Sequence, residues 1–307
     1  MSALRRAAEK YLALRRALGF KLRCPAGLLR QFISFLEKRH APLVTTELAL
    51  EWAQESPGVQ PSTWARRLGV IRQFARHWSA TDPRTEVPPL GLLPHRYRRR
   101  APYLYTQAQI VRLMAVARKL KGLRRFSYPT LFGLLAVTGL RGSEALALDR
   151  ETVDLEEGLL TIHRTKFGKS RLVPLHPSTV RALRRYARRR DEILPNPRSP
   201  AFFLSNQGTR LTEWIARWTF IKLSRQIGLR GPQDRSGPRL HDFRHRFAVR
   251  TLLGWYRGGR DVERLMPLLS TYLGHTHVAD TYWYLSAAPE LLSLAGARLE
   301  RTWGGLP

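Results

Sequence analysis

The chain has 307 residues, 43% of them hydrophobic and 25% charged, which suits about two globular domains and argues against a disordered protein. No apolar run approaches the roughly 20 residues that span a bilayer, no signal peptide is expected, and the single cysteine, Cys24, excludes an internal disulfide. The net charge of +30 favours nucleic acid as the partner, with an anionic membrane surface as the weaker alternative.

Residues 1–80 are predicted to form a helical DNA-binding domain. Apolar side chains recur there at spacings of three and four residues, for example Leu4, Ala7, Ala8 and Tyr11. Arginines lie on the polar faces of two of these helices. For any single one a solvated helix face is the better explanation, but as a set they suggest a surface that contacts phosphates. The candidates are Arg30, Arg66, Arg67 and Arg72.

Residues 81–101 are predicted to be a basic linker. Four prolines, including Pro88 and Pro89, disfavour a helix, and a run of arginines follows them. Arg98 and Arg99 in this run are further candidates for DNA contacts.

Residues 102–307 are predicted to form a second domain that is mainly α-helical with a small antiparallel β-sheet. Thr106 is a candidate N-cap of its first helix. Strands are expected around 160–162 and 172–175. Helices are expected over 107–119, 129–137, 141–148, 177–190, 212–227, 240–254, 262–273, 279–285 and 289–301. The last helix carries an apolar stripe that suits docking either on its own domain or on a neighbouring protomer.

The segment Thr-Gly-Leu-Arg-Gly-Ser-Glu places Arg141 at the start of a helix, with Glu144 three residues later on the same face. The carboxylate can orient a guanidinium that points at an anion, although most such pairs are ordinary surface ion pairs. Lys166 and Lys169 lie at the turn of the expected hairpin. Either lysine could protonate a leaving oxygen, and a solvated basic turn is the plainer alternative.

Two histidine-containing segments follow. His241 and Arg244 are three residues apart on an expected helix, so both can face one phosphate. His245 gives the spacing of a zinc helix, but the glutamate of that motif and any thiol cluster are absent, so no metal is expected. Nine residues separate His275, which follows a glycine, from Tyr284.

In this order and spacing, the segments resemble the tyrosine site-specific recombinases of the phage-integrase and Xer-type family. The matching residues are Arg141, Lys166, His241, Arg244, His275 and Tyr284. Residues 171–175, Arg-Leu-Val-Pro-Leu, also resemble the strand that follows the hairpin in Xer-type proteins. The resemblance implies a helical core-binding domain and a catalytic domain that clamp a DNA duplex.

The resemblance also implies roles at a DNA phosphodiester. Arg141 and Arg244 would neutralise the non-bridging oxygens, Glu144 would orient Arg141, and His275 would hydrogen-bond the phosphate. The nucleophile would be Tyr284, which the nine-residue spacing favours over Tyr282.

Two residues would move protons. Lys166, favoured over Lys169 by the family pattern, would protonate the departing 5′-oxygen, and His241 would help to take the proton of the tyrosine. The bond energy stays in the phosphotyrosine, so neither ATP nor another cofactor is expected.

The expected partner is double-stranded DNA with an inverted-repeat recombination site, bound by a homo- or hetero-tetramer in the cytoplasm at the nucleoid. A recombinase carried on a mobile element is one possible subtype. Two alternatives stay open at this point: strand relaxation like that of a type IB topoisomerase, and a non-catalytic relative that only binds DNA.

Overall fold

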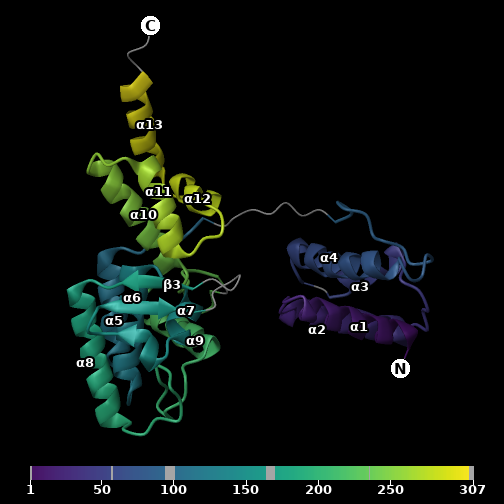
Figure 1. The fold of residues 1–307 in the computed structure, drawn as a ribbon, viewed down its shortest axis with the longest axis horizontal. Helices are drawn as coiled ribbons and strands as arrows, with labels where there is room; N and C mark the ends of the chain where they lie inside the picture. The colour runs from purple at the N-terminus through teal and green to yellow at the C-terminus, as the bar shows by residue number, and fades with distance from the viewer. Residues whose placement is uncertain (1, 57, 94–100, 164–169, 235, 304–307) are drawn as a thin grey trace. The chain divides into compact units, whose positions relative to one another are not determined.

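The computed structural model describes residues 2–56, 58–93, 101–163, 170–234 and 236–303. The chain divides into two compact units, Met1–Arg100 and Ala101–Pro307. Both are mainly helical, and the second contains a small antiparallel sheet (Figure 1). The predicted fold class is therefore confirmed.

In the part of the first unit that the structure describes, four helices surround one apolar core. Thr45 begins the third of them by accepting a hydrogen bond from the backbone N–H of Leu48, which satisfies one of the free donors at the helix start. Phe32, Leu36 and Phe74 are fully buried at the centre. The helices are α1 (Ala3–Ala17), α2 (Arg23–Lys38), α3 (Thr46–Gln54) and α4 (Pro61–Trp78).

The described part of the expected linker, residues 81–93, packs onto the first unit. It is not helical, but Val87 and Leu93 lie against the apolar core of the unit. The backbone N–H of Glu86 donates to the carbonyl of Val44 at 2.9 Å. Proline removes the donors that a helix needs but leaves apolar side chains and carbonyls free to pack. Arg98 and Arg99 lie outside the described residues.

The second unit is built on the sheet order β1-β2-β3. The strands are β1 (Val153–Asp154), β2 (Leu159–Ile162) and β3 (Arg171–Pro174), and Leu160 lies opposite Val173 in the antiparallel register. The helices are α5 (Gln107–Ala117), α6 (Arg124–Thr138), α7 (Gly142–Ala147), α8 (Pro177–Ile193), α9 (Glu213–Gln226), α10 (Asp242–Arg257), α11 (Val262–Leu273), α12 (Ala279–Ala287) and α13 (Pro289–Trp303). Figure 1 shows α10 to α13 gathered at one end of this unit.

The differences from the sequence prediction with the clearest physical reasons are at α6, β1 and α10. Helix α6 begins at Arg124, five residues early, and holds Pro129 inside its first turns. Strand β1 has two residues, too few for any alternation to be seen in the sequence. Helix α10 begins at Asp242, so His241 is its N-cap. The predicted bounds of α11 and the cap at Thr106 are confirmed.

The last helix, α13, packs against α10 and α12 of its own unit. Leu291 is fully buried there, whereas Leu292 and Leu299 are more than half exposed. Among the described residues, none of the helices combines the length and the apolar character that crossing a bilayer requires.

Candidate active site

Arg141 and Glu144 lie where α6 ends and α7 begins. Gly139 ends α6 in the left-handed conformation, with φ of +62°. A Cβ at this position would lie 2.5 Å from the ring of Phe247, so only glycine fits. The chain then turns so that Arg141 becomes the N-cap of α7, and its backbone N–H donates to the Glu144 carboxylate at 3.0 Å.

The Glu144 carboxylate binds two guanidinium groups. Arg141 donates to one carboxylate oxygen at 2.7 Å, and Arg171, from β3, donates to both oxygens at 3.2 and 2.8 Å. Burial by itself would raise the pKa of Glu144, but the hydrogen bonds from Arg171 and Arg141 outweigh it and lower the pKa to about 2. Glu144 therefore stays ionised and fixes both arginines.

We expect Glu144→Gln to make the unfolding free energy less sensitive to acid. The pKa of Glu144 falls from 4.5 to about 2 on folding, so the stability due to the carboxylate is present above about pH 5 and is lost as the pH falls towards 2. At about 1.4 kcal/mol per pKa unit, roughly 1–2 kcal/mol of the difference between wild type and variant should disappear between about pH 5 and 3. Urea unfolding at several pH values measures this difference.

Glu9→Gln is the control for this prediction. The hydrogen bond from Arg30 also lowers the pKa of Glu9, but this pair is exposed and an exposed ion pair contributes little. This variant should therefore depart from the pH dependence of the wild type much less than Glu144→Gln does. A constant gap between wild type and Glu144→Gln across this pH range would contradict the role given to the Glu144 carboxylate.

Arg244 is the most deeply buried cation of the site. It occupies the first turn of α10 with 1% of its surface exposed. Its guanidinium donates to the carbonyl of Gly139 at 3.0 Å and to that of Leu273 at 2.6 Å. Burial, together with the positive charge of Arg141, lowers the pKa of Arg244 to about 10, which leaves it charged at neutral pH.

Three arginines converge on the end of α11. Three successive carbonyls accept from different guanidinium groups: Tyr272 from Arg171 at 2.8 Å, Leu273 from Arg244 at 2.6 Å, and Gly274 from Arg141 at 3.2 Å. The negative end of the helix dipole suits these cations. Because only Glu144 offsets the three positive charges within this group of bonded side chains, the arrangement suits a phosphate.

Gly274 and Thr281 position His275. Gly274 ends α11 with φ of +68°, and a Cβ there would lie 2.8 Å from the Arg171 guanidinium. His275 follows it, and its Nδ1 lies 2.7 Å from the hydroxyl of the fully buried Thr281. This hydrogen bond fixes the orientation of the imidazole ring beside the end of α11.

Tyr284 faces the other site residues. Its ring stacks near His275 at 6.2 Å between centroids and lies 5.6 Å from His245. It is 2% exposed and lies close enough to Arg244 to influence the pKa of that guanidinium. Tyr282, on the same helix, is 45% exposed, so the two rings have different surroundings.

His241 lies at the start of α10, with its ring 4.7 Å from that of His245. Although part of the side chain contacts solvent, partial burial together with Arg244 lowers the pKa of His241 to about 4. The imidazole is therefore neutral at pH 7 and can accept a proton. Lys166 and Lys169 lie outside the described residues.

The candidate DNA-binding arginines of the first unit are mostly bonded within it. Arg30 forms two hydrogen bonds with Glu9, Arg67 donates to the carbonyl of Ala53 and to Ser56, and Arg72 donates to the carbonyls of Pro88 and Pro89. Arg66 is exposed. Their role in DNA binding stays a prediction.

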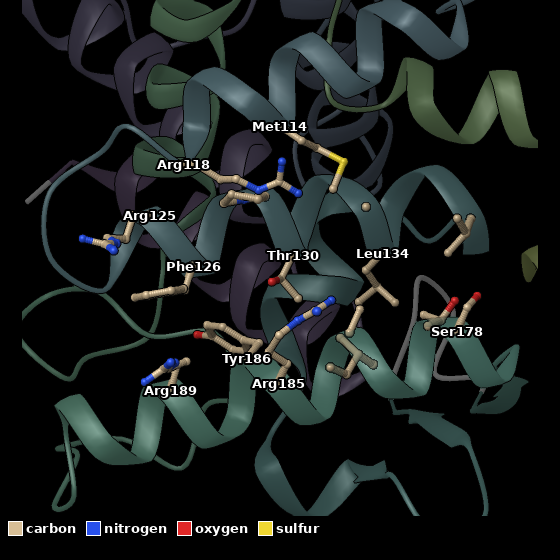
Figure 2. Close-up of a pocket in the computed structure, with 16 residues that line it drawn as sticks. Met114, Arg118, Arg125, Phe126, Thr130, Leu134, Ser178, Arg185, Tyr186 and Arg189 are labelled. Carbon is tan, nitrogen blue, oxygen red and sulfur yellow. The ribbon is translucent and has the colours of Figure 1, made fainter.

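A groove of about 650 Å³ is lined mainly by α6 and α8 and contains none of the predicted catalytic residues (Figure 2). Phe126 and Leu134 are among its apolar lining residues, and Figure 2 shows arginines of α6 and α8, among them Arg125 and Arg189, around it. It is separate from the cluster around Glu144.

Sequence reasoning missed two positioning residues, Arg171 and Thr281. The sequence pattern indicates Arg171 only as part of a strand. Arg171 is 27 residues from Glu144 and 101 residues from Tyr272 in the sequence, so no local pattern links them. They come together only because β3, α7 and α11 meet in the folded unit. Thr281 lies six residues after His275, and no rule of local spacing marks it.

The sequence is similar to those of known DNA recombinases. Residues 104–290 match the model of the phage integrase family. The chain is 52% identical to the integrase/recombinase y4rB of Sinorhizobium fredii over 99% of both chains. It is 30% identical to the tyrosine recombinase XerD of Caulobacter vibrioides, over 77% of this chain and 74% of that protein. These names favour the recombinase interpretation over the topoisomerase alternative.

Solved structures show the same fold. An integrase of the transposon Tn1549 in complex with transposon right-end DNA aligns with a TM-score of 0.68 at 17% identity, over 96% of this chain and 98% of that one. A XerH recombinase bound to a palindromic difH substrate aligns with a TM-score of 0.66 at 19% identity, over 90% and 78%. The family match over residues 104–290 and the 52% identity to the Sinorhizobium fredii protein show that the chain belongs to the phage integrase family of tyrosine recombinases, enzymes that cleave and rejoin DNA strands.

Proposed function

We propose that the protein is a site-specific DNA recombinase that acts through a 3′-phosphotyrosine on Tyr284. The observation that carries the proposal is the position of Tyr284 beside Arg244 and His275, next to the three arginines at the end of α11. A tyrosine near so much fixed positive charge is suited to attack a phosphodiester.

In the proposed reaction the Tyr284 oxygen forms a bond to phosphorus as the bond to the 5′-oxygen breaks. Arg141 and Arg244 stabilise the charge on the non-bridging oxygens, with Arg141 oriented by Glu144. His275, oriented by Thr281, donates to the phosphate.

Two groups move the protons in this step. His241, whose imidazole is neutral at pH 7, accepts the proton of the tyrosine hydroxyl. Lys166 gives a proton to the departing 5′-oxygen. The free 5′-hydroxyl of a second strand then attacks the phosphotyrosine, which restores the tyrosine and joins the strands without ATP.

The substrate proposed is duplex DNA with an inverted-repeat recombination site. The net charge of +30 supports a polyanion, and the XerH neighbour was solved on a palindromic substrate. We infer a tetramer of this chain, or of this chain with a related recombinase, acting on two sites in the cytoplasm at the nucleoid. The transposon integrase among the structural neighbours supports a role on a mobile element. Arg98, Arg99 and Lys169 are proposed as further phosphate contacts.

A nicked suicide duplex tests the proposal. The duplex carries inverted repeats from the DNA that flanks the gene, and its nick lets the strand beyond the cleaved phosphate diffuse away. We expect a protein–DNA adduct on a denaturing gel with EDTA present throughout. Tight binding to every flanking repeat without any adduct would contradict the enzymatic proposal and favour a protein that only binds DNA.

A further inference from the structure

A groove of about 770 Å³ begins at Arg141 and His241 and extends along α9. Trp214 and Arg217 line it from that helix, and Arg239 lines it from the loop before α10. The groove is therefore continuous with the group of side chains to which the proposed function assigns the scissile phosphate.

Trp214 is unusually exposed for so large an apolar side chain. It keeps 73% of its surface accessible, and within the described ranges no aromatic ring or cation stacks on its indole. Trp218, one turn further along α9, is 54% exposed, and the ammonium group of Lys222 lies 5.9 Å from its ring centroid. Of these two exposed tryptophans, Trp214 lines the groove and Trp218 does not.

The charge of the groove is positive. Besides Arg141 it is lined by Arg217, Arg230 and Arg239, against the single carboxylate of Glu213. Arg230 donates to the carbonyl of Pro238 and Arg239 pairs with Asp242.

Arg217 differs from these neighbouring arginines. In the part of the chain that the structure describes, it forms neither a hydrogen bond nor an ion pair, and it is exposed. Its guanidinium is therefore available to an anionic ligand.

These features select DNA as the occupant. An acidic protein segment would also match the charge, but the groove opens directly onto Arg141, which the proposed function places on a DNA phosphate. The DNA next to that phosphate has to lie along one side of the site. An α-helix such as α9 is of a width that enters the major groove, where base edges are exposed.

We propose that α9 reads the DNA next to the scissile phosphate. Trp214 packs against the edge of the adjacent base pair and sets a base preference there, and Arg217 binds the adjoining phosphate without regard to sequence. The inference rests on the proposed function, because that function places the scissile phosphate at Arg141.

The test uses suicide duplexes in which the base pairs on either side of the cleaved phosphate are changed one at a time. We expect wild type to form the adduct about tenfold faster with the preferred base pair than with the others at one adjacent position. Trp214→Ala should reduce that ratio to about twofold or less, whereas Trp218→Ala, the matched control, should keep it. Arg217→Ala should slow all sequences alike and reduce the salt dependence of binding by about one phosphate contact.

Equilibrium binding to the same duplexes separates this inference from the proposed function. If wild type binds with a base preference but forms no adduct, the proposed function fails, and loss of that preference in Trp214→Ala still supports the groove. The inference is overturned if Trp214→Ala keeps the preference of the wild type, or if Trp218→Ala loses it to the same extent.

Discussion

Tyr284→Phe is expected to abolish the covalent protein–DNA adduct while leaving the affinity for duplex DNA within about twofold of the wild type. The substitution removes only the nucleophilic oxygen, and without it no bond to phosphorus can form. The ring remains to fill its buried place beside His275 and His245, so the fold should be kept. Adduct formation on the suicide duplex and a binding isotherm at fixed salt measure the two quantities.

Tyr282→Phe is the matched control, because it makes the same change two residues away on α12. Its side chain is 45% exposed, and we expect its adduct yield to equal that of the wild type. An adduct from Tyr284→Phe together with none from Tyr282→Phe would assign the nucleophile to Tyr282.

Arg141→Ala is expected to slow cleavage by about 10²–10³-fold while weakening DNA binding by less than about tenfold. A donor aimed at developing charge contributes more in the transition state than in the bound ground state, and losses of this size follow removal of one such donor. Single-turnover rates of adduct formation, measured at saturating protein, separate the chemical step from binding.

Arg244→Lys tests the second phosphate-binding arginine with less disturbance of the core. The lysine keeps a positive charge but cannot bond the carbonyls of Gly139 and Leu273 with one planar fork. We expect a loss of cleavage similar to that of Arg141→Ala, and thermal unfolding checks that the variant is folded.

Arg66→Ala serves as the contrasting variant for both arginines. Arg66 is exposed on the first unit and is predicted to contact only the DNA backbone, so binding and the cleavage rate at subsaturating protein should fall in parallel. If Arg141→Ala also lowered both in parallel and cleaved normally at saturation, Arg141 would be an ordinary phosphate contact.

Most of the helices could be predicted from the sequence because their signals are local. Thr106 caps α5 through neighbouring backbone groups, and the apolar spacing of α11 gives its bounds directly. The start of α6 could not be predicted, because proline is typical of the first turn of a helix, whereas α6 begins five residues before Pro129. Residues 81–93 were expected to be a linker, since the proline pattern does not reveal that Val87 packs on the core.

The sequence by itself determined most of the chemical groups of the site, because the Thr-Gly-Leu-Arg, His-x-x-Arg and Leu-Gly-His segments each lie within a few residues. It could not show how these segments meet. The hydrogen bonds from Arg141, Arg171 and Arg244 to Gly274, Tyr272 and Gly139 span 133, 101 and 105 residues. Contacts at such separations depend on how β3, α7, α10 and α11 pack, which no local periodicity encodes. Only the tertiary structure therefore showed that Arg171 bonds Glu144 and that Thr281 bonds His275. It also placed the ring of Tyr284 close to the buried Arg244.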